Sequence, residues 1–147
     1  MTRFLLDVNT VLALLDPRHV FHDAAHAWAE RESSARWLTC PLVQNGVVRV
    51  ASQPAYPNHL GTPGAVRAVV QAFCAHARHE FCPDDVSLLD DDVLLRPELL
   101  TPSRVTDLYL LALARRHRAK LATFDTRIPA DAVRGGKSAL ELIDSAR

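Results

Sequence analysis

The sequence has no net charge that would indicate a charged partner such as a nucleic acid. Its 147 residues contain seventeen Lys and Arg and seventeen Asp and Glu. A balanced chain has no overall attraction to a polyanion, so a nucleic-acid site must rest on a local basic patch. Charged residues make up 23% of the chain and hydrophobic residues 48%, which argues against disorder. The length suits one ordinary domain, and we expect a single domain over residues 1–147.

Cysteines and long apolar runs are also scarce. The chain has three cysteines, Cys40, Cys74 and Cys82, and an odd number without a signal peptide is a poor disulfide framework. The first residues lack the apolar core of a signal peptide. No apolar run approaches the ~20 residues that a membrane-spanning helix needs. We therefore expect a reduced, cytoplasmic protein with no membrane partner.

Short apolar segments alternate with helical patterns along the whole chain. The pattern predicts strands at residues 4–8, 37–40 and 121–124, a weaker strand within 80–89, and a strand or short helix at 139–143. It predicts helices at 11–15, 23–32, 41–52, 66–77 and 105–120, with Thr10 and Thr106 as N-caps and a helical turn within 93–100. This alternation indicates a three-layer α/β/α fold with a short, mainly parallel central sheet.

Two of the predicted strands end in an aspartate, Asp7 and Asp125, and Asp107 lies near the start of the longest helix. In an open parallel sheet, ligands bind outside the carboxyl ends of the strands, so we expect these three carboxylates to converge. Like charges held close together are costly unless a cation neutralises them, and hard oxygen ligands select Mg²⁺ or Mn²⁺. Such a site orients a phosphodiester and activates water. The competing interpretation is that each acid is a turn or helix cap.

Four segments, in this order along the chain, resemble the motifs of PIN-domain nucleases. Phe4–Asn9 resembles the family's opening strand, Thr39–Val50 its second motif, Thr106–Ala114 its third and Leu121–Asp125 its fourth. The likeness extends to the VapC toxins, which are small ribonucleases inhibited by a cognate VapB antitoxin. The resemblance implies a PIN-like fold, a metal-dependent endoribonuclease that cleaves RNA, a homodimer and a VapB-type antitoxin as partner.

The resemblance also implies which residues form the site. It assigns metal binding to Asp7, Asp107 and Asp125, and it places Gln44 at the catalytic position where family members carry a glutamate. Because glutamine keeps the shape but loses the negative charge, we expect weaker metal affinity and activity. Asn9 and Thr123 are expected to donate or accept hydrogen bonds that hold the metal ligands in place. Candidates for RNA backbone contacts are Arg104, Arg115, Arg116 and Arg127.

Two rival functions remain at this point. Asp7-Val8-Asn9-Thr10-Val11 also resembles the opening strand of haloacid-dehalogenase phosphatases, but Asn9 stands where that family needs a second aspartate as general acid. The other rival is a PIN-fold protein that Gln44 has disabled and that still binds an antitoxin or RNA. For the antitoxin, we expect a hydrophobic surface on the helices between residues 12 and 28.

Overall fold

The centre of the protein is a parallel five-stranded sheet in the order β3-β2-β1-β4-β5, as seen in a computed structural model that describes residues 1–145. The strands are β1 (Arg3–Leu6), β2 (Arg36–Thr39), β3 (His79–Phe81), β4 (Lys120–Thr123) and β5 (Leu140–Leu142). Each neighbouring pair is parallel. The predicted parallel sheet is confirmed, and the ambiguous segment near residue 140 is a strand.

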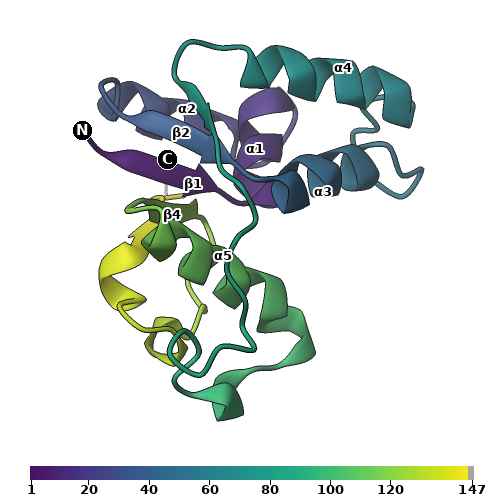
Figure 1. Cartoon of the computed structure of the whole chain (residues 1–147). Coiled ribbons are helices and arrows are strands. Elements are labelled where there is room, and N and C mark those ends of the chain that lie inside the picture. Colours follow the sequence, from purple (N-terminus) through teal and green to yellow (C-terminus); the bar gives the residue numbers. More distant parts are fainter. Residues whose placement is uncertain (146–147) are drawn as a thin grey trace.

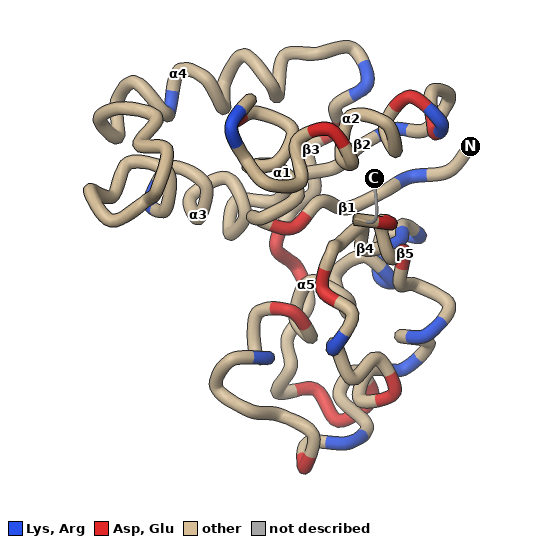
Figure 2. Tube along the Cα trace, turned by 180° about the vertical axis from the view of Figure 1, so that it is seen from behind, with Lys and Arg blue, Asp and Glu red and all other residues tan. Residues whose placement is uncertain are grey.

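Helices cover both faces of this sheet. They are α1 (Val8–Leu15), α2 (His22–Arg31), α3 (Pro41–Ala51), α4 (Pro63–Cys74) and α5 (Val105–Arg116). Right-handed crossovers from β1 to β2 to β3 put α1 to α4 on one face, and the step back to β4 puts α5 on the other. Figures 1 and 2 show α5 and the pair α1 and α2 on opposite sides of the sheet. The three-layer prediction is therefore confirmed.

Both predicted threonine caps were wrong. The N-cap of α1 is Asp7, whose Oδ1 accepts a 2.8 Å hydrogen bond from the backbone amide of Thr10, so the helix begins at Val8. Arg104 occupies the N-cap position of α5 and makes no capping hydrogen bond from its side chain. The helix ends at Arg116 because Arg118 adopts a positive φ of 55°, a left-handed conformation that terminates helices.

The core confirms the expectation that α5 is buried on several sides. Leu108, Leu110, Leu111 and Leu113 are almost fully inaccessible. The C-terminal segment packs against α5 closely enough that a Cβ on Gly136 would lie 2.1 Å from the carbonyl oxygen of Ala130, which explains the glycine there. Within residues 1–145, none of the helices has the length and apolar character to cross a membrane.

Candidate functional site

The sheet has a topological switch point between β1 and β4. The two strands are neighbours, yet the chain leaves β1 toward β2 and leaves β4 toward β5, in opposite directions. Ligand sites of open α/β sheets form at such points, outside the carboxyl ends of the strands. Asp7 follows β1 directly, and Asp125 lies two residues beyond the end of β4. Asp107 comes from the first turn of α5.

These three aspartates line one open cleft of about 360 Å³. The cleft lies between α1 and α3 on one side and α5 on the other. Its complete lining within the described residues is Asp7, Val8, Asn9, Leu12, Val50, Thr106, Asp107, Leu110, Thr123 and Asp125. The structure thus places the three expected carboxylates around a common space.

Asp7 is the most buried of the three carboxylates. Its Oδ1 accepts a hydrogen bond from the Thr10 amide, and its Oδ2 accepts one of 2.7 Å from the Thr123 hydroxyl. Burial raises the pKa of Asp7, the hydrogen bonds from Thr10 and Thr123 oppose this, and the charge of Asp107 adds to the rise. A carboxylate in this position is costly when charged and gains most from a nearby cation.

The two residues expected to support the ligands hold different positions. Thr123 joins both strand ends, because its hydroxyl also accepts a 3.1 Å hydrogen bond from the backbone amide of Asp125. Asn9 is exposed and lines the cleft, and its Oδ1 lies 2.9 Å from Nε2 of His19. The sequence analysis missed His19, which reaches the rim of the cleft from the loop after α1.

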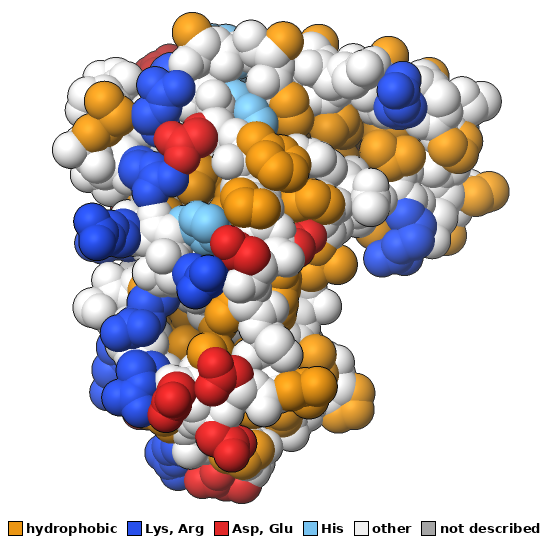
Figure 3. Space-filling model, viewed as in Figure 1, with side chains coloured by type: hydrophobic (Ala, Val, Ile, Leu, Met, Phe, Trp, Pro, Cys, Tyr) orange, Lys and Arg blue, Asp and Glu red, His pale blue; other side chains and the backbone are white. Residues whose placement is uncertain are grey.

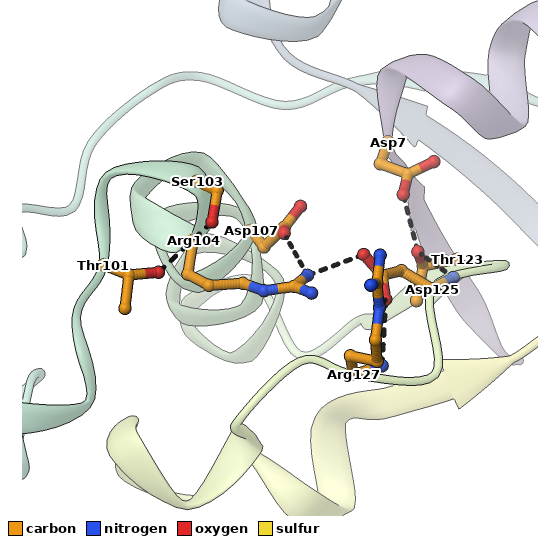
Figure 4. A network of polar contacts seen from close by, with 8 residues as sticks. All are labelled: Asp7, Thr101, Ser103, Arg104, Asp107, Thr123, Asp125 and Arg127. Atoms are coloured by element: carbon orange, nitrogen blue, oxygen red, sulfur yellow. Dashed lines mark hydrogen bonds and ion pairs between the residues drawn. The ribbon is translucent and has the colours of Figure 1, made fainter.

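Arg104 bridges the other two carboxylates (Figure 4). Its Nη1 lies 3.0 Å from Oδ2 of Asp107 and 2.6 Å from Oδ2 of Asp125. Burial raises the pKa of Asp107, and Arg104 only partly offsets this. Burial also acts to raise the pKa of Asp125, but hydrogen bonds from Arg104 and from the backbone amide of Arg127 outweigh it and lower that pKa. The i,i+3 spacing of Arg104 and Asp107 was the signal in the sequence for this contact.

The donor atoms of the cleft suit a hard divalent cation. Three carboxylates and a threonine hydroxyl offer only oxygen, which Mg²⁺ and Mn²⁺ prefer. The Arg104 guanidinium is a stand-in cation between two of the carboxylates. As they stand, no three His, Cys, Asp or Glu side chains within residues 1–145 are grouped closely enough to hold a metal. The donor chemistry therefore fits the metal, while Arg104 takes up part of its space.

Gln44 lies outside the cleft. Its Nε2 donates a 3.0 Å hydrogen bond to the Thr39 hydroxyl and lies 3.9 Å from Sγ of Cys74. The reason is the phase of α3: Val50 faces the cleft, and six residues at ~100° per residue place position 44 about 120° away, toward α4. This placement does not support the catalytic role that the resemblance implied for position 44.

The candidate RNA-binding arginines lie at two ends of the molecule. Arg127 is 80% exposed and pairs with Asp125 at the cleft. Arg115 and Arg116 end α5, far from the cleft, where Arg115 and Arg118 line two adjoining hollows. Neither hollow has an Asp or Glu in its lining among the described residues. Figure 3 shows Lys and Arg side chains gathered along the edge of the molecule where the strands begin.

The expected hydrophobic surface between residues 12 and 28 is mostly core. Leu12, Leu14 and Trp28 are buried, and Val20 is the large apolar side chain exposed there. An apolar groove of about 740 Å³ lies instead between α3 and α4. Its lining includes Val48, Val70 and two arginines, Arg49 and Arg67.

Comparison with known proteins gives consistent matches. The family model of the PIN domain matches residues 4–133. Ribonuclease VapC44 of Mycobacterium tuberculosis strain H37Rv is 46% identical over 134 residues, which cover 90% of this chain and 93% of that protein. Ribonuclease VapC38 of the same strain is 40% identical over 140 residues, covering 95% and 96%.

Two solved structures share the fold at low sequence identity. VapBC2 from Rickettsia felis, bound to a DNA fragment from its promoter, has a TM-score of 0.63 and 16% identity, and the match covers 97% of this chain and 100% of that one. FitAB bound to the IR36 DNA fragment has a TM-score of 0.59 and 14% identity, with 95% and 94% covered. These likenesses agree with the three-layer architecture.

Proposed function

This chain belongs to the PIN domain family, and we propose that it is a metal-dependent endoribonuclease, the VapC-type toxin of a toxin–antitoxin pair. The observation that carries the proposal is the cleft at the β1–β4 switch point, which Asp7, Asp107 and Asp125 line. We further propose that residues 1–147 act as one domain in the reducing cytoplasm, since the three cysteines are free.

In the proposed reaction, Asp7 and Asp107 would hold Mg²⁺ or Mn²⁺, and Asp125 would complete the site. When bound, such a cation polarises the phosphoryl oxygen and lowers the pKa of an attacking water. Thr123 fixes Oδ2 of Asp7, and the start of α1 fixes Oδ1, so the carboxylate is oriented before any ligand arrives. Asn9 and Thr106 border the same space and are positioned to contact the RNA backbone.

The basic residues support RNA as the substrate. Arg127 is placed to contact a phosphate beside the cleft, because it is exposed and tethered to Asp125 through both its side chain and its amide. The hollows around Arg115 and Arg118 offer a second basic surface without carboxylates. An RNA that reaches both places must extend at least ~12 Å along α5, the rise of the helix from Asp107 to Arg115.

The proposed partners are a VapB-type antitoxin and a second copy of this chain. The groove between α3 and α4 suits an amphipathic helix of the antitoxin, because its apolar floor is bordered by Arg49 and Arg67. These arginines would pair with acidic side chains on the polar face of such a helix. We propose this groove in place of the surface between residues 12 and 28.

The alternative is a PIN-fold protein that binds antitoxin or RNA without turnover. The position of Arg104 between Asp107 and Asp125 favours it, because a guanidinium there leaves less room for a metal. A haloacid-dehalogenase phosphatase has no comparable support, since the family match assigns the Asp7 strand to the PIN domain.

The test is RNA cleavage by this chain and by Asp7→Asn, each in Mg²⁺, in Mn²⁺ and in EDTA, on a panel of structured RNAs. The proposal predicts cleavage by the unaltered chain that EDTA and Asp7→Asn abolish. RNA binding without cleavage in either metal would support the binding protein instead. Cleavage that persists equally in Asp7→Asn would remove the aspartate cleft from the reaction.

A further inference from the structure

Arg104 is held against two carboxylates of the cleft more firmly than an ordinary surface arginine. Its side chain is 16% exposed, and one nitrogen, Nη1, contacts both Asp107 and Asp125. Figure 4 shows the guanidinium lying between the two carboxylates, with Asp7 above them and joined to Thr123. The residue stands immediately before α5, so its backbone is fixed by the helix that also carries Asp107.

We propose that Arg104 competes with the divalent metal: it neutralises Asp107 and Asp125 in the metal-free chain and must leave them before a metal binds. This inference rests on the proposed function and concerns the same cleft. Arg104 and a metal would use the same oxygen atoms, because Oδ2 of Asp107 and Oδ2 of Asp125 both accept hydrogen bonds from Arg104. A lone pair that accepts a hydrogen bond cannot ligate a cation at the same time. Two cations in one small space also repel each other.

The need for a cation at this position follows from the surroundings. Asp107 and Asp125 both contact Nη1 of Arg104, and the charge of Asp125 adds to the rise that burial causes in the pKa of Asp107. Burial adds to that cost, so the pair requires a positive partner at neutral pH. Arg104 supplies one positive charge to the two carboxylates without any ligand. A divalent ion supplies two charges on a smaller radius and is the stronger partner.

A displaced Arg104 has a further use. Because the Cα of Arg104 is fixed at the start of α5, the released guanidinium stays beside the cleft. There it can bind a phosphate of the substrate. Arginine binds phosphate through two parallel hydrogen bonds, which suits this task. Arg104 would therefore oppose metal binding and favour RNA binding, and these opposite effects distinguish it from a residue that only supports the fold.

Arg127 is the natural control, because it contacts the same aspartate without bridging. Its Nε lies 3.6 Å from Oδ1 of Asp125, the oxygen that Arg104 does not use, and its side chain is almost fully exposed. Arg127→Gln thus removes one positive charge beside Asp125 but leaves the Arg104 bridge in place. Arg104→Gln removes the bridge, and Arg104→Lys keeps the charge on one nitrogen that can still donate to both carboxylates, as Nη1 of Arg104 does.

The experiment measures Mn²⁺ affinity without RNA, by electron paramagnetic resonance of free Mn²⁺, for the full chain and the three variants. We expect Arg104→Gln to bind Mn²⁺ about tenfold more tightly, a gain of the size that loss of one nearby charge produces. Arg127→Gln should change affinity less than threefold, and Arg104→Lys should stay near the unaltered chain. RNA affinity, measured in Ca²⁺ by fluorescence anisotropy, should fall at least fivefold in Arg104→Gln.

Two results overturn the inference, and they are distinguishable. If the unaltered chain binds Mn²⁺ and cleaves RNA while Arg104→Gln binds Mn²⁺ no more tightly, the competition is wrong and the proposed function stands. If neither the chain nor any variant binds Mn²⁺, the metal-dependent function fails and the competition fails with it. A melting curve of Arg104→Gln that matches the unaltered chain in EDTA shows that the comparison is between folded proteins.

Discussion

The Thr123 hydroxyl donates a 2.7 Å hydrogen bond to Oδ2 of Asp7 and so ties the end of β4 to the end of β1. The same hydroxyl accepts from the amide of Asp125, which sets the start of the loop that carries the second carboxylate. One side chain therefore fixes two of the three acids.

Thr123→Val should lower RNA cleavage and Mn²⁺ affinity by about 10–100-fold, the usual effect of removing a residue that orients a metal ligand. Valine keeps the volume and loses the hydroxyl, so Asp7 would be left with an unsatisfied buried oxygen. Thr123→Ser should retain activity within about threefold of the unaltered chain. Equal activity of the valine and serine variants would show that the hydroxyl plays no part.

Asp7→Asn should stabilise the protein when metal is absent. Burial raises the pKa of Asp7, so the folded state binds its proton more tightly than the unfolded state does. The stabilising contribution of Asp7 is fully present below its ordinary pKa of 3.8 and is lost as the pH rises through the elevated value in the folded state. Asparagine does not ionise, so the Asp7→Asn variant does not lose this stability as the pH rises.

The measurement is thermal unfolding in EDTA from pH 4.5 to 7.5. The melting temperature of Asp7→Asn should exceed that of the unaltered chain at pH 7.5, by roughly 2–4 °C for each kcal/mol at this chain length, and the gap should narrow toward pH 4.5. Saturating Mg²⁺ should raise the melting temperature of the unaltered chain alone. A gap that widens on acidification would contradict this account of Asp7.

Gln44→Glu should change RNA cleavage less than threefold, because position 44 lies on the α4 side of α3 and its side chain contacts Thr39 and Cys74. The measurement is the single-turnover cleavage rate in Mg²⁺. Gln44→Ala is the matched control, since it removes the contact with Thr39 without adding charge. A gain of tenfold or more in Gln44→Glu alone would restore the expectation that a glutamate here belongs to the site.

The order of strands and helices could be predicted because each buried strand is a short apolar run and each helix has a clear apolar stripe. The positions of Asp7 and Asp125 could be predicted for the same reason: a residue within two positions of the end of a buried strand is placed by the sheet. The direction of the Gln44 side chain could not be predicted, because the resemblance gave a place in a motif and not the rotation of α3. Arg104 was read as a phosphate contact, since a sequence shows charge but not which carboxylates surround it.

The first residue of a helix was also difficult to predict from the sequence. Asp7 and Thr10 are both good N-cap residues, and the choice between them depends on where the strand stops. The structure favours Asp7, whose carboxylate caps α1 with one oxygen and contacts Thr123 with the other. The sequence allowed two interpretations of Asp7, as a ligand of a metal site or as a helix cap. In the structure Asp7 caps α1 and also lines the cleft.

Neutralising the basic hollows should weaken RNA binding in a way that depends on salt. Arg115→Ala combined with Arg118→Ala should reduce the slope of log affinity against log salt by about 1.4, because each single-strand phosphate contact contributes about 0.7. Binding is measured in EDTA with an RNA too long to fit the cleft alone. Arg31→Ala combined with Arg96→Ala, two exposed positions elsewhere, is the charge-matched control. Equal slopes for both pairs would remove the hollows from the RNA surface.

We propose that one metal site built from Asp7, Asp107 and Asp125 performs RNA cleavage. The most direct test measures Mn²⁺ occupancy and cleavage rate on the same samples, for the unaltered chain and for Asp107→Asn, across a titration of Mn²⁺. The account predicts that both quantities rise with the same midpoint in the unaltered chain, and that Asp107→Asn shifts both to higher Mn²⁺ together. Cleavage that is already maximal before Mn²⁺ binds, or binding that Asp107→Asn leaves unchanged, would contradict it.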